Sequence, residues 1–117
     1  MNTANLQLEG LYMAVAALIE LLKEKGLVTA AEVDIALARA EGAAYGGKGD
    51  ELSPSNMDAI GFPVRLLRIA NSTALSSQTL PFHELARRVG EARDRRSTLT
   101  EDETLKLATI LEHERDA

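Results

Sequence analysis

The chain has 117 residues, a formal net charge of −5 and no cysteine. This is the length of one domain, and the missing cysteines exclude disulfides, thiolate metal sites and a cysteine nucleophile. The negative charge disfavours a general nucleic-acid or anionic-membrane surface. Aromatic residues make up only 3%, so the core must be aliphatic and rich in alanine, which suits helices better than sheets. We expect a single all-α domain over residues 1–117.

The pattern of residues 4–25 predicts a long helix that is apolar nearly all round. Large apolar residues recur at three- and four-residue steps, and small residues lie opposite them. Such a helix must be covered on most of its sides, while small residues let another helix approach closely. Either later helices of the same chain cover both sides, or one side meets a second subunit or a protein partner. We favour the latter and expect a homodimer or a complex with a protein partner, with these interface candidates: Leu8, Gly10, Leu11, Ala14, Val15, Ala17 and Leu18.

The same segment bears on the location of the protein. Its longest apolar run, residues 11–19, is shorter than the roughly 20 residues that span a bilayer, and no charged leader precedes it. We therefore expect a cytoplasmic protein without a membrane segment.

The next residues predict a second helix that pairs with the first. Gly26 is a typical helix terminator, and Thr29 with Glu32 forms the pattern of a capping box. The second helix is expected to run to residue 44. Because the connection is short, we expect the two helices to form an antiparallel hairpin.

The remaining elements are shorter and separated by loops. A glycine-rich loop is expected over residues 46–53, and Ser53 with Pro54 opens a short helical segment to residue 60. Pro63 predicts a break, followed by a helix over 63–71 with Arg65 and Arg68 outward. After a loop over 71–79, helices are expected over 81–95 and 100–114. The chain is therefore predicted to be a small bundle of about five helices.

One segment resembles the helix-turn-helix family of DNA-binding proteins. In the stretch FHELARRVG, Ala86 stands where that family has a small residue, and Gly90 stands where it turns. The resemblance implies a nucleic-acid-binding regulator. It departs from the family at Glu91 and Arg96, where the recognition helix has apolar anchors. Phosphate contacts need only positive charge, and the candidates for them are Arg87, Arg88, Arg93, Arg95 and Arg96.

Motifs of catalysis and of ligand binding are incomplete. Residues 42–48 match the opening of a phosphate-binding loop, but Gly49 replaces the hydroxyl residue that holds magnesium. His83 lacks the spaced acidic partner of a helical metal site, and His113 has one only in Asp116, near the end of the sequence. No nucleophile motif is present. We therefore name no catalytic residue, no metal ligand and no cofactor. The expected function is a protein–protein interaction or accessory module, with a nucleic-acid-binding regulator as the alternative and an enzyme of unknown reaction as the third.

Overall fold

The computed structural model describes residues 3–46, 52–75 and 78–95. These residues form three long helices, α1 (Thr3–Glu24), α2 (Ala30–Tyr45) and α3 (Pro54–Thr73), and a fourth helix over residues 82–95. The all-α class is confirmed, with four helices in this part of the chain. The helix expected over 100–114 lies outside the described residues.

The turn from α1 to α2 follows the sequence signals closely. Gly26 has a φ of +71°, and the N–H groups of Gly26 and Leu27 donate to the carbonyls of Lys23 and Leu22. This double closure is a Schellman motif, which needs a left-handed residue and so favours glycine. The Thr29 hydroxyl accepts from the Glu32 N–H, and the Glu32 carboxylate accepts from the Thr29 N–H. The predicted capping box is therefore confirmed.

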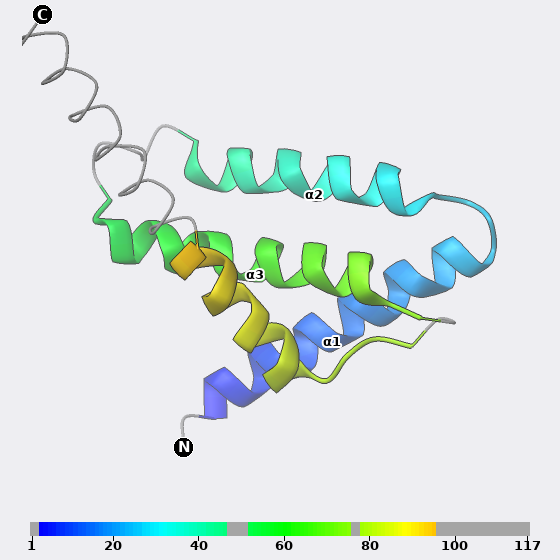
Figure 1. Ribbon diagram of the computed structural model, residues 1–117, viewed down its shortest axis with the longest axis horizontal. Helices are drawn as coiled ribbons and strands as arrows, with labels where there is room; N and C mark the ends of the chain where they lie inside the picture. Colours follow the sequence, from blue (N-terminus) through cyan, green and yellow to red (C-terminus); the bar gives the residue numbers. More distant parts are fainter. Residues whose placement is uncertain (1–2, 47–51, 76–77, 96–117) are drawn as a thin grey trace, which may run out of the picture.

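The expected pairing of α1 with α2 is not how the helices pack. α3 lies between them and runs antiparallel to α2 (Figure 1), and α2 and α1 each pack on α3 far more than on each other. The physical reason is that α3 can pack against other helices on two of its sides. It buries Leu66 and Ala70 on one side and presents Arg65 and Arg68 to acidic residues of α2 on the other.

The break predicted at Pro63 is also wrong, because α3 continues through this proline. Proline inside a helix removes one hydrogen bond and costs about 3 kcal/mol. Tertiary contacts on both sides of Pro63 offset this cost. Gly61 lies against the Tyr45 hydroxyl, Phe62 packs on the core, and Leu66 one turn later is fully buried.

The core is small and aliphatic, as the composition predicted. Its fully buried members come from α1, α3 and the helix at 82–95, which crosses the other two (Figure 1), and they are Ala16, Leu66, Ala70, Leu85 and Val89. No residue of α2 is fully buried. The core therefore joins three helices, while α2 lies at the edge.

Candidate interaction surface on α1

One side of α1 is built into the domain. Ala16 is buried in the core, and Tyr12 and Met13 pack beside it. One turn further on, Glu20 is buried as well. These positions are three to four residues apart, so they share one helix face. This face fixes how α1 is rotated about its own axis.

The opposite side of α1 is apolar and exposed. Leu11 and Leu18 are 57% and 60% exposed, and Leu8 and Leu22 also lie in solvent. Val15, between them, is half-buried. We call the five residues the α1 seam: Leu8, Leu11, Val15, Leu18 and Leu22.

The spacing within the α1 seam is informative. Its steps are three, four, three and four residues, which is the heptad repeat of a coiled coil. On another side of α1, Gly10, Ala14 and Ala17 are exposed too, and the space around Gly10 is open. The structure thus brings all seven sequence-predicted interface residues to the accessible part of α1. Sequence reasoning did not include Leu22, although continuing the heptad repeat by one step identifies it.

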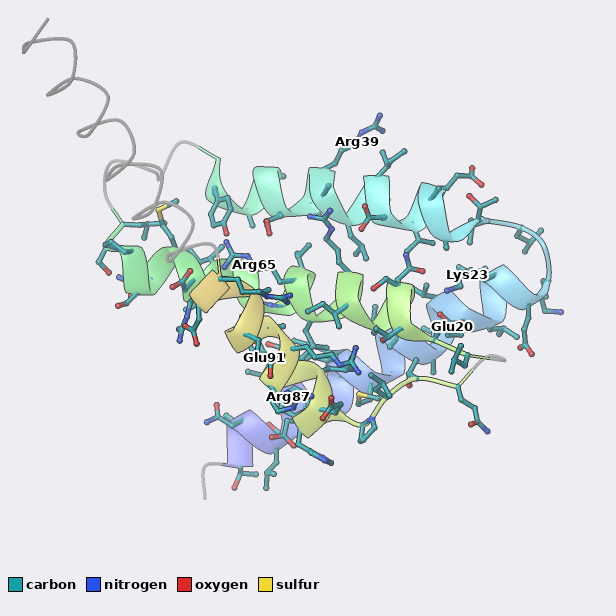
Figure 2. All side chains as sticks on the ribbon, viewed as in Figure 1. Glu20, Lys23, Arg39, Arg65, Arg87 and Glu91 are labelled. Atoms are coloured by element: carbon teal, nitrogen blue, oxygen red, sulfur yellow. The ribbon has the colours of Figure 1, made fainter. Side chains whose placement is uncertain are left out.

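A polar cluster anchors the C-terminal end of α1 to α3 and α2. Lys23 Nζ lies 2.6 Å from Glu20 Oε1, as an ion pair rather than a hydrogen bond. The same ammonium donates to the backbone carbonyl and the side-chain oxygen of Asn71 at 3.2 and 2.9 Å. Asn71 in turn donates to the Ala30 carbonyl. Figure 2 shows Glu20 and Lys23 together where α1 passes below α3. The cluster prevents α1 from leaving α3 without stranding buried polar groups.

Two arginines of α3 are committed to α2 rather than to solvent, contrary to the sequence prediction. Arg65 donates to Glu41, Asp58 and Tyr45, and burial works against its positive charge while these partners favour it, so that its pKa is raised overall. Arg68 forms a two-point contact with Asp34. The hydrogen bond from Arg68 lowers the pKa of Asp34.

These arginines also line a pocket of about 280 Å³ between α2, α3 and the helix at 82–95. Because both guanidinium groups already hold carboxylates, an anionic ligand there has to displace Asp34 or Glu41. The pocket therefore offers no free positive charge.

The arginines of the helix at 82–95 are also paired with carboxylates. Arg87 contacts Glu84 and Glu91, and Arg88 Nε lies 3.1 Å from Glu84; Figure 2 shows Arg87 and Glu91 facing each other. Hydrogen bonds from Arg87 and then Arg88 lower the pKa of Glu84 to about 2. Phosphates therefore have to compete with carboxylates for these side chains.

The remaining arginine candidates give a similar result. Arg93 lies 3.6 Å from Asp94, Arg95 is exposed, and Arg96 lies outside the described residues. The turn implied at Gly90 by the helix-turn-helix resemblance is absent, because the helix continues to residue 95. Uninterrupted helical hydrogen bonding across Gly90 needs no left-handed residue there.

Other sequence patterns do not assemble into sites in the described part of the chain. Residues 42–45, the first half of the phosphate-loop match, belong to α2, so their backbone N–H groups point along a helix. Among the described residues, no three histidine or acidic side chains converge as a metal site.

α1 is long and apolar enough to span a membrane. The apolar run of residues 11–19, considered alone in the sequence, was too short for this. The mostly buried core helix of a soluble protein and a signal sequence near the N-terminus meet the same criterion, so length and composition alone do not assign a role to α1.

A comparison of the chain with protein-family profiles, with curated proteins and with solved structures finds no match.

Proposed function

We propose that the protein is a homodimerising interaction module whose subunits pair through α1. The observation that supports this is the exposed heptad repeat of the α1 seam. Monomeric proteins leave few large apolar patches in water, and here four leucines line one helix face in solvent. The 22 residues of α1 make a helix about 33 Å long. This length accommodates three heptads.

A second copy of the chain is the occupant that fits the α1 seam best. Two-fold pairing brings the same surface of both subunits together, and a heptad stripe is complementary to itself through knobs-into-holes packing.

A bilayer is the competing occupant, and the inner face of α1 argues against it. Ala16 belongs to the core, and Lys23 holds Asn71 of α3. Insertion of α1 into lipid requires both contacts to break. We place the module in the cytoplasm, since a chain without cysteine needs no oxidising compartment to fold.

The test is a light-scattering measurement of mass across a concentration series. Replacing Leu11 and Leu18 by glutamate removes two leucines per subunit from the seam. Burial of one leucine contributes about 1.5–3 kcal/mol, so the variant is expected to dimerise at least 100-fold more weakly, an order-of-magnitude figure. Both side chains already lie in water in the monomer, so the helical circular dichroism signal should be unchanged.

The matched control replaces Ile35 and Leu75 by glutamate. These residues are 55% and 79% exposed but lie outside α1, so this variant should dimerise like the original chain. A monomer at every concentration would refute the proposal. So would equal loss of dimer in both variants. Flotation of the protein with lipid vesicles, lost in the Leu11 and Leu18 variant, would assign the seam to a membrane instead.

A further inference from the structure

A second pocket lies beside the N-terminal half of α1 and gathers most of the aromatic residues of the chain. It measures about 280 Å³ and is lined by Asn5, Leu8, Glu9, Tyr12, Phe62 and Phe82. The whole sequence contains four tyrosines and phenylalanines, and three of them meet here. They come from α1, from α3 and from the helix at 82–95, so only the folded chain forms this group.

The three rings pack against one another, with nearly equal distances between their centroids. The ring centroids lie 6.2 Å apart for Tyr12 and Phe62, 6.1 Å for Tyr12 and Phe82, and 6.4 Å for Phe62 and Phe82. All three residues are half-buried, so part of each ring remains accessible from the pocket. A single cationic group there can lie within about 6 Å of every centroid, the range in which a ring quadrupole attracts a cation.

Glu9 adds a negative charge to the same pocket. Its side chain is half-buried, and within residues 3–46, 52–75 and 78–95 it has no ion pair with a lysine or arginine. No arginine or lysine is found among the described residues that line the pocket. Aromatic rings together with a carboxylate that has no ion pair among the described residues favour a positively charged occupant.

We propose that this pocket binds the trimethylammonium group of a small molecule. This group is large, weakly hydrated and unable to donate hydrogen bonds, so it loses little on leaving water. The lining supplies three aromatic rings and one carboxylate, which attract a cation that needs no hydrogen-bond acceptors to replace its hydration. The pocket is distinct in function from the α1 seam, although Leu8 borders both.

The experiment is an NMR titration of the protein with choline. The reference ligand is the neutral carbon analogue of choline, in which a tert-butyl group replaces the trimethylammonium group. We expect choline to shift the resonances of Glu9, Tyr12 and Phe82 in a saturable way, and the neutral analogue to bind at least about fivefold more weakly. Equal binding of the two ligands, or no saturable shift with choline, would overturn the proposal.

Two variants test the residues that carry the charge argument. Glu9→Gln keeps the size of the side chain and removes its charge, and Phe82→Leu removes one ring but keeps an apolar side chain. Each is expected to weaken choline binding about fivefold. Glu24→Gln, an exposed change on the same helix, is the matched control and should leave choline affinity unchanged. Loss of affinity in the control equal to that in Glu9→Gln would show a general charge effect and overturn the assignment.

Two further experiments test whether the ligand is a free small molecule or part of a protein, and whether binding depends on the dimer. A trimethyllysine peptide that binds more weakly than choline supports a free small molecule, and one that binds much more tightly overturns that part of the proposal in favour of a protein partner. The titration is repeated on the Leu11 and Leu18 double variant. Choline binding to that variant supports the pocket whether or not the native chain dimerises, so the two proposals fail separately.

Discussion

Replacing Lys23 by methionine should destabilise the domain by about 2–4 kcal/mol. The change keeps much of the apolar stem but removes the ammonium that pairs with Glu20 and donates twice to Asn71. Removing one partner of a buried pair costs about 3–5 kcal/mol, because the other charge remains buried and unpaired. The Lys23 side chain is 17% exposed, so water partly compensates, and we lower the estimate accordingly.

The assay for this prediction is urea unfolding followed by far-UV circular dichroism. It is performed at one protein concentration, because dimerisation couples to apparent stability. Lys25→Met is the matched control, since Lys25 is exposed just beyond the end of α1 and surface changes stay within about 0.5 kcal/mol. A second replacement, Glu20→Met, should recover much of the loss when combined with Lys23→Met. The reasoning is refuted if Lys23→Met costs no more than Lys25→Met.

The other predictions concern α3, the first turn and the helix at 82–95. Pro63→Ala restores one helical hydrogen bond, but it also raises the conformational entropy of the unfolded chain. We expect a net gain of about 1–2 kcal/mol in the free energy of unfolding. A lower free energy of unfolding in urea would contradict this. Gly26→Ala places a side chain at φ +71° and should cost about 1–2 kcal/mol, measured as a lower urea midpoint. Glu84 has a pKa of about 2 in the folded chain, so its contribution is complete above the ordinary value of about 4.5 and is lost as pH falls toward 2. An NMR pH titration should show the Glu84 midpoint rising toward its ordinary value when Arg87 and Arg88 become glutamine, and an unchanged midpoint would reject the assigned cause.

Local signals in the sequence predicted the ends of the helices well. The Thr29 and Glu32 capping box and the terminator at Gly26 depend on a few neighbouring residues, so sequence alone contains them. Pro63 shows the limit of such rules. Its cost is local, but the packing of Phe62 and Leu66 that offsets it comes from other helices.

In the candidate surfaces too, local sequence predicts some features and only tertiary packing explains the others. Exposure of Leu11 and Leu18 was predictable, because the apolar residues of α1 exceed what one core-facing stripe requires. The solvent positions predicted for Arg65 and Arg68 were wrong, since nothing near them in the sequence indicates that α2 brings Glu41 and Asp34 to them. The aromatic pocket was missed for a related reason. Its three rings lie far apart in the chain, and only the crossing of three helices brings them together.

The position of α2 at the edge of the fold has a consequence for how the domain opens. α2 buries no residue fully, and ion pairs and hydrogen bonds from Arg65 and Arg68 hold it against α3. Regions with little buried apolar surface open at a small fraction of the global unfolding free energy, and salt weakens partly exposed ion pairs. Backbone amides of α2 should therefore exchange with solvent before those of α3, and faster as ionic strength rises. This opening would uncover the side of α3 that carries Arg65 and Arg68 and would break the hydrogen bond from Asn71 to Ala30, while the core residues of the other three helices stay in contact.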